Sequence, residues 1–430
     1  MKNRIELLKK LLGENKEVSD YKINFVGTKS SELFFVGKKL ETSRATDVCD
    51  ILVTVYKDHD GKKGESAFSV YESMTEADLK EKIAAAVTRA KLVSNEPYDI
   101  VDGKIAEREV PSNFSDYEPK ELAALIAKAV QKADLLGNGA INALEIFVYK
   151  HETKVINSRG VDVAEIKYDA MIEAIPTWNE NGESVELYEA YRFTEFDEAD
   201  IIAEINEKMR EVRDRQHAAK PAEKIEADVV LNMQEAGSLF SELAGDLNYA
   251  SVYSHLNLHK IGDDLQNGGD KTGDKITVTM KGEMKGSDYS AAFDSDGFEL
   301  VDKTVIENGK VVGYYGMNRF ASYLGEKPTG NLRCVSVSGG TLTDGELEKT
   351  TYLECVSLSG LQLDLYNDYI GGEIRLAYLH KDGKVIPLTG ISMSGSLSGV
   401  LSSIRLSDKI KVRRNYGGPY KVLLKGMEIL

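Results

Sequence analysis

The sequence predicts an α+β protein in which an N-terminal α/β domain is followed by a largely antiparallel β domain. Its 430 residues are too many for one ordinary hydrophobic core, so more than one domain is expected. Helix-like and strand-like segments alternate in the first half, and hairpin signals replace helix signals in the second half. The expected domains are residues 1–220 and 225–430, separated by a small, charged, proline-containing linker.

Apolar residues at helical spacing predict four helices in the first domain, at Ile5–Leu12, Leu79–Leu92, Leu122–Leu136 and Ile201–Val212. Two of them have clear start signals. Thr75 can cap the second helix, and Glu118-Pro119 places proline in the first turn of the third. Runs rich in β-branched and aromatic residues predict strands at Ile51–Tyr56, Leu144–Tyr149, Ala164–Ile175 and Val185–Arg192.

Two parts of this domain resemble each other, which predicts an internal duplication of residues 1–95 and 118–217. The stretches Asp47–Ile83 and Asp162–Ile205 both run from an Asp-Val strand through a Gly-Glu-Ser turn to another strand and an acidic-capped helix. A predicted helix precedes each stretch. Two such halves would cover each other's open apolar face. Chance similarity between amphipathic segments is the alternative.

Turn dipeptides indicate antiparallel strands in the second domain. Asn308-Gly309 and Asp382-Gly383 each lie between strand-like runs, the strongest short-range signal for a hairpin. The Ser- and Gly-rich stretch Gly390–Gly399 has no nucleophile-elbow motif, so a strand and a turn are expected there.

Composition excludes several classes of function. A net charge of −16 argues against direct nucleic-acid binding, and the one basic stretch, Lys409–Arg414, is expected on the solvated side of a strand. No apolar run approaches the roughly 18 residues of a membrane span, and the N-terminus lacks the apolar region of a signal peptide. A cytoplasmic protein is therefore expected. Cys49, Cys334 and Cys355 are few and far apart, which predicts reduced, core-type thiols.

Two segments suggest metal sites, and both are weak. His255 and His259 would share one face of a helix, as zinc ligands often do, but no third ligand lies nearby. Surface or hydrogen-bonded histidines are the simpler interpretation. The acidic turn Phe293–Gly297 lacks two of the ligands that an EF-hand requires.

A series of short motifs in a particular order resembles the TldD/PmbA family, and within it the TldE/PmbA-type branch of "modulator of DNA gyrase" proteins. The stretch Ala291–Gly297 (AAFDSDG) is similar to the family's Phe-Asp-x-Glu-Gly signature, and Ser158-Arg159-Gly160 is similar to a family turn. The other motifs are Thr329-Gly330, Gly339-Gly340, Gly371–Ile374 and Ser394–Ser396.

The peptidase branch of this family binds zinc through His-Glu-x-x-x-His on a helix and a Cys near the C-terminus, and its motif Glu acts as general base. The corresponding helix here keeps Glu235 and Glu242 but has Gln234 and Leu239 at the histidine positions. No Cys stands in the matching turn, Arg414–Gly418. The resemblance therefore implies no catalytic, cofactor or metal residue in this chain. Both glutamates are expected on the solvent side of the helix.

The resemblance implies a non-catalytic subunit of a cytoplasmic TldD-type metallopeptidase, acting in proteolysis or peptide maturation. Zinc is expected in the TldD-like partner of a heterodimer, and this chain would bind or enclose peptide substrate, for instance along an open edge strand. Neither nucleic acid nor membrane is an expected partner. Two alternatives stay open. One is an autonomous metallopeptidase with a non-standard site at His255 and His259, and the other is a homodimeric peptide-binding module.

Overall fold

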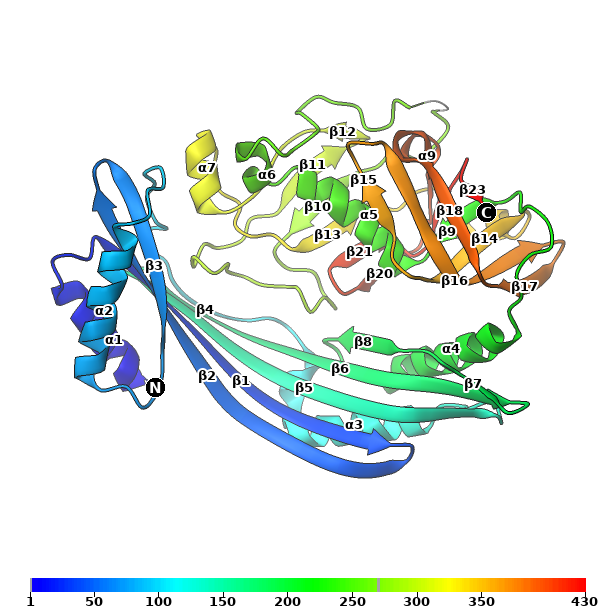
Figure 1. The fold of residues 1–430 in the computed structure, drawn as a ribbon, viewed down its shortest axis with the longest axis horizontal. Helices are drawn as coiled ribbons and strands as arrows, with labels where there is room; N and C mark the ends of the chain where they lie inside the picture. The colour runs from blue at the N-terminus through cyan, green and yellow to red at the C-terminus, as the bar shows by residue number, and fades with distance from the viewer. Residues whose placement is uncertain (1, 269–270) are drawn as a thin grey trace.

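The computed structural model describes residues 2–268 and 271–430. A long, curved sheet formed by the first half of the chain lies beneath the second half, which packs over the concave side of that sheet (Figure 1). Within the described residues, no helix is both long and apolar enough to cross a membrane.

The curved sheet has eight strands and is mostly antiparallel. Its order is β3-β2-β1-β5-β6-β4, with β7 and β8 also paired to β6. The strands are β1 (Asp20–Val36), β2 (Lys39–His59), β3 (Lys62–Val70), β4 (Ile105–Glu109), β5 (Gly139–Asn157), β6 (Asp162–Glu180), β7 (Glu183–Glu186) and β8 (Glu189–Phe193). Several are far longer than the apolar runs that predicted them, and β1 was not predicted.

Four long helices cover the two ends of this sheet, as the sequence predicted. They are α1 (Lys2–Glu14) and α2 (Glu76–Ala90) at one end, and α3 (Pro119–Gln131) and α4 (Glu198–His217) at the other (Figure 1). Each pair buries its apolar face against the strands, forming two separate hydrophobic clusters. Thr75 caps α2 in a capping box with Asp78, and Pro119 opens α3.

The two halves of the sheet have a similar order of elements: a helix, a set of consecutive antiparallel strands and a second helix. The first runs α1-β1-β2-β3-α2, and the second runs α3-β5-β6-β7-β8-α4, with β1 and β5 paired at the centre. The internal duplication stays a prediction. The predicted Gly-Glu-Ser turn is right in the second stretch, where Gly182 lies in the turn, and wrong by a few residues in the first. The chain reverses at Asp60-Gly61 and at Asn181-Gly182, where all four residues have positive φ. Gly64 instead lies within β3.

The second half forms two further sheets that share one hydrophobic core. The six-stranded sheet has the order β12-β11-β10-β13-β21-β20. The nine-stranded sheet has the order β19-β22-β9-β14-β16-β18-β23, with β15 and β17 paired to β16. The strands are β9 (Asp228–Leu231), β10 (Val278–Lys281), β11 (Lys303–Glu307), β12 (Lys310–Val311), β13 (Cys334–Val337), β14 (Tyr352–Leu358), β15 (Gln362–Asp364), β16 (Tyr369–Lys381), β17 (Lys384–Leu388), β18 (Ile391–Ser396), β19 (Arg405–Leu406), β20 (Ile410–Arg413), β21 (Tyr416–Pro419), β22 (Val422–Leu424) and β23 (Glu428–Ile429).

Further helices pack around these sheets: α5 (Met233–Asp246), α6 (Tyr249–Tyr253), α7 (Asn318–Leu324), α8 (Asp344–Leu347) and α9 (Leu397–Ser403). Both predicted hairpins are confirmed, since Asn308-Gly309 joins β11 to β12 and Asp382-Gly383 joins β16 to β17. The turn expected after β18 is wrong. Ser396 caps α9 there by accepting a hydrogen bond from the Gly399 amide.

All three cysteines are free thiols. Cys334 and Cys355 are buried in the core of the second half, as predicted. Cys49 is exposed on β2, so the expectation of a core thiol is wrong at that position.

Candidate functional site

A cavity of about 650 Å³ lies between the concave face of the long sheet and the second half of the chain. Strands β1, β5, β6 and β8 form one wall, and the opposite wall comes from residues 288–295 together with Arg333 and Arg414. Because side chains alternate along a strand, Glu165, Lys167 and Asp169 of β6 all face this space.

The sheet wall carries a chain of polar contacts across four strands. His151 on β5 is opposite Thr28 on β1 and Lys167 on β6. Its Nδ1 lies 3.2 Å from the Thr28 hydroxyl, and its Nε2 lies 2.9 Å from an Asp169 carboxylate oxygen. Arg192 on β8 lies 3.9 Å from the other Asp169 oxygen. This wall therefore presents both signs of charge to the cavity.

Lys167 crosses the cavity wall and holds the facing loop. Its ammonium donates to the backbone carbonyls of Asp288, at 3.1 Å, and Ser290, at 2.8 Å. Burial lowers the pKa of Lys167 and raises the pKa of Glu165, whose carboxylate accepts a hydrogen bond from the Ala292 amide. Two groups on β6 thus fix the backbone on either side of Tyr289.

The family signature in Phe293–Gly297 is a docking contact between the two halves. Asp294 is buried and accepts hydrogen bonds from the backbone amides of Asp296, Phe298 and Asn331, at 2.9, 3.1 and 3.2 Å. Burial raises the pKa of Asp294 to about 6. This turn makes two contacts with strand β1. Asp296 forms an ion pair with Lys22, and the Ser295 carbonyl accepts a hydrogen bond from the Asn24 side chain.

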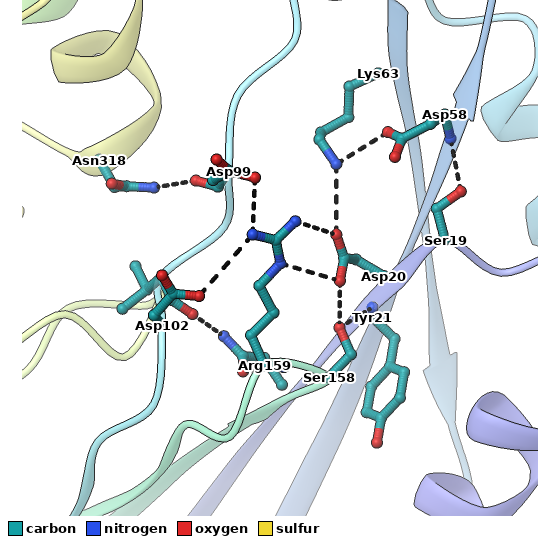
Figure 2. A network of polar contacts seen from close by, with 12 residues as sticks. Ser19, Asp20, Tyr21, Asp58, Lys63, Asp99, Asp102, Ser158, Arg159 and Asn318 are labelled. Carbon is teal, nitrogen blue, oxygen red and sulfur yellow. Dashed lines mark hydrogen bonds and ion pairs between the residues drawn. The ribbon is translucent and has the colours of Figure 1, made fainter.

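The turn Ser158-Arg159-Gly160 joins β5 to β6 and centres a second polar network (Figure 2). The Arg159 guanidinium contacts Asp20 at 3.2 Å and Asp99 at 2.7 Å. Asp20 is also 3.5 Å from the buried ammonium of Lys63. Asn318, at the start of α7, donates to the Asp99 carbonyl at 2.7 Å, so the network reaches from the sheet to the second half.

Ion pairs at both ends of the sheet hold the second half in place. At one end, Arg319 on α7 bonds to Glu65 on β3 at 2.9 Å. At the other end, Arg413 bonds to Glu189 at 2.8 Å and to Glu204 at 3.1 Å. The expectation of a solvated basic strand is therefore wrong for Arg413. Its side chain is 28% exposed because β8 and α4 supply two carboxylates opposite it.

Helix α5 contains the segment that resembles the zinc helix of the peptidase branch, and the residues at its two histidine positions have different surroundings. Gln234 is exposed, whereas Leu239 is fully buried. Five residues correspond to about 140° around a helix, so these positions lie on different sides of it. Glu242 is exposed, as expected. Glu235 is buried, contrary to expectation, because it lies four residues before Leu239 on the same face.

Burial raises the pKa of Glu235, which keeps its carboxyl group closer to neutrality than that of an exposed glutamate. The turn Arg414–Gly418 packs on α5: Tyr416 stacks on Phe240 with ring centroids 6.1 Å apart, and Asn415 donates to Ser241 at 3.2 Å. A carboxamide, an alkyl group and a turn without a thiol do not fit zinc. Within residues 2–268 and 271–430, no group of three His, Cys, Asp or Glu side chains could hold a metal ion.

His255 and His259 do not share a helical face, because α6 ends at Tyr253 and His255 has a φ of 56° in the turn beyond it. His255 is exposed. The His259 ring nitrogen Nδ1 lies 3.0 Å from Asp246, which also accepts hydrogen bonds from the amides of Leu258 and His259. The Asp246 carboxylate therefore fixes this loop at the end of α5.

Sequence reasoning missed the groups that line the cavity. No sequence motif marks Arg333, Arg414 or Tyr289. These residues approach one another only because strands distant in the sequence pair in the fold. The Phe-Asp-Ser-Asp-Gly signature was recognised, but its docking role depends on β1 and on the β5–β6 hairpin more than a hundred residues earlier.

Residues 224–430 match the family model of the PmbA/TldA metallopeptidase C-terminal domain. No curated protein matches the chain. The crystal structure of TldE from Thermococcus kodakarensis matches with a TM-score of 0.79 at 16% identity, covering 100% of this chain and 99% of that chain.

Two proposed modulators of DNA gyrase have similar structures. The Thermotoga maritima protein matches with a TM-score of 0.77 at 16% identity, covering 99% of this chain and 100% of that one. The Bacteroides thetaiotaomicron protein matches with a TM-score of 0.77 at 14% identity, covering 100% of this chain and 99% of that one. At these identities the likeness shows the fold. The resemblance seen in the sequence is confirmed: residues 224–430 match the model of the PmbA/TldA metallopeptidase C-terminal domain, and the whole chain has the fold of TldE.

Proposed function

We propose that this chain is a non-catalytic, peptide-binding subunit that assists a TldD-type zinc peptidase in the cytoplasm. The cavity between the curved sheet and the second half is the observation that carries the proposal. Its volume of about 650 Å³ is typical of ligand sites, which range from about 300 to 1,000 Å³. Its walls combine charged side chains with aromatic and aliphatic surface, as a site for peptides of varied sequence requires.

An edge strand adjoins this cavity. Strand β20 is the last strand of the six-stranded sheet, and Arg414, which follows it directly, lines the cavity. The exposed residues Ile410 and Val412 flank its free edge. An extended peptide can add to such an edge through main-chain hydrogen bonds and place its end in the cavity.

The surroundings of α5 support a non-catalytic role. The carboxamide of Gln234 and the alkyl side chain of Leu239 stand at the two histidine positions, and neither group is a zinc ligand. Without zinc, this helix cannot supply an activated water, so peptide hydrolysis is assigned to the partner.

Co-expression with a TldD-type protein from the same genome tests this proposal. We expect a stable complex in size-exclusion chromatography with light scattering, and stoichiometric zinc in the partner but not in the isolated chain by elemental mass spectrometry. Stoichiometric zinc together with chelator-sensitive hydrolysis by the isolated chain would establish an autonomous peptidase and overturn the proposal. Homodimers that bind peptide and ignore every TldD-type partner would favour a separate peptide-binding module.

A further inference from the structure

Two arginines of the second half meet at one wall of the cavity. Arg333 precedes β13 and Arg414 precedes β21, and these strands pair in parallel with Val335 opposite Tyr416. Each arginine therefore stands two residues before a directly paired residue, at the same end of neighbouring strands. The guanidinium carbons of Arg333 and Arg414 lie 5.2 and 5.6 Å from the centroid of the same ring, that of Tyr289.

Both guanidinium groups keep donors free for a ligand. Arg414 donates once, to the Tyr289 hydroxyl at 3.0 Å. In the part of the chain that the structure describes, neither Arg333 nor Arg414 forms an ion pair with a carboxylate. Each guanidinium has five N–H donors in a planar fork that matches a carboxylate, and stacking on an aromatic ring limits its rotation. We call Arg333, Tyr289 and Arg414 the clamp. Its two guanidinium groups are held in place by the ring and keep N–H donors available for a ligand.

The backbone at Arg414 is an independent sign of a role for this side chain. Arg414 and Asn415 form the two-residue turn between β20 and β21, and Arg414 has a φ of 53°. Two-residue hairpins usually place glycine or asparagine at such a position, because a larger side chain there costs about 1 kcal/mol or more. Non-glycine residues in this conformation are enriched at functional sites.

The ring of the clamp is fixed from the opposite wall. Lys167 bonds to the carbonyls on either side of Tyr289, and the Tyr289 amide donates to Ser287 at 3.2 Å. Asp288, next to Tyr289, also lines the cavity. Its Oδ1 is buried without a hydrogen-bond partner among the described residues, and burial raises its pKa.

We propose that Arg333 and Arg414 bind a carboxylate of the peptide in the cavity. This inference rests on the proposed function and adds a substrate class: peptides that present either a free C-terminus or an acidic side chain. Two guanidinium forks on one ring suit a group that accepts bidentate, charge-assisted hydrogen bonds. The carboxylate anchors the peptide end beside the free edge of β20.

Fluorescence anisotropy with N-terminally labelled, unstructured octapeptides tests the inference on the full chain. Four peptides are compared. Two contain a glutamate and two do not, and each sequence is made both with a free C-terminal carboxylate and with a C-terminal amide. We expect the peptide that lacks every carboxylate to bind roughly 10- to 100-fold more weakly than its acid forms, the effect of one charge-assisted contact. Sensitivity to amidation identifies the chain end as the ligand, and sensitivity to the glutamate identifies the side chain.

Variants then assign the effect to the clamp. Arg333→Gln and Arg414→Gln should each remove most of the preference for carboxylate-bearing peptides, whereas Arg375→Gln, at an exposed arginine on β16, should leave it unchanged. Arg414→Gly relieves the positive φ, so its thermal stability should equal or exceed that of the native chain while the preference is lost. This combination separates binding from folding.

The failure of this inference is distinguishable from the failure of the proposed function. Equal binding of all four peptides, or an unchanged preference in the Arg333→Gln/Arg414→Gln double variant, would overturn the clamp and leave peptide binding intact. Absence of binding by every peptide to the native chain and to its complex would overturn both.

Discussion

Gly297, in the docking turn of the second half, offers a test of how the two halves are joined. A Cβ atom added there would lie 2.5 Å from Val161 Cγ1 and 3.2 Å from Val155 Cγ1, on the β5–β6 hairpin. The residue also has a φ of +77°, which side-chain-bearing residues rarely adopt. Alanine at this position therefore meets both a steric and a conformational penalty.

The two penalties have separable sizes. The left-handed conformation costs about 1–2 kcal/mol, and overpacking against the valines costs about 1–3 kcal/mol. Gly297→Ala should thus lower the free energy of unfolding by about 2–5 kcal/mol. Gly182→Ala is a matched control, because Gly182 has a φ of +83° and open space around its Cβ position. This control should lose only the conformational part.

Urea unfolding followed by the fluorescence of the single tryptophan, Trp178, measures both variants. Trp178 is buried in β6, in the sheet on which the turn docks. The reasoning is refuted if Gly297→Ala is no more destabilising than Gly182→Ala, because the valine contact would then contribute nothing. A larger loss in Gly297→Ala alone confirms that the signature turn joins the halves.

Three further predictions concern the same interface. Burial raises the pKa of Asp294 from 3.8 to about 6, so the native state loses stability as the pH rises from 4 to 6. In urea titrations, the native chain should lose on the order of 3 kcal/mol of unfolding free energy between pH 4 and 7 relative to the Asp294→Asn variant. A difference between the two proteins that does not change with pH would contradict this prediction. Arg413→Gln leaves Glu204 without its cationic partner and Glu189 with Lys208 alone, and should destabilise by about 2–4 kcal/mol in thermal unfolding. An unchanged midpoint would show that the pairs are dispensable. Hydrogen exchange of the β20 backbone amides should slow when a peptide binds. Unchanged exchange would show that the peptide does not bind by adding a strand to β20.

Local signals predicted the local structure well. Thr75 and Pro119 marked the starts of helices, and Asn308-Gly309 and Asp382-Gly383 marked hairpins, because capping and two-residue turns depend on a few adjacent residues. The long strand β1 was missed because its central section, including Thr28 and Ser30, is polar. Apolar runs therefore understated the strand.

The cavity could not be predicted in the same way. Lys167, Tyr289, Arg333 and Arg414 come together only through pairing of β13 with β21 and through docking of the second half on the sheet. One error was avoidable: Glu235 lies four residues before Leu239, so helical spacing alone places it on the buried face of α5.

The central claim is that this chain binds peptide for a zinc peptidase and does not cut it. The most direct test follows cleavage of an unstructured peptide by mass spectrometry in three samples: this chain, its TldD-type partner, and the two together. The account predicts no cleavage by this chain and faster cleavage by the mixture than by the partner alone. Cleavage by this chain alone, or a partner whose rate is unaffected by it, would contradict the account.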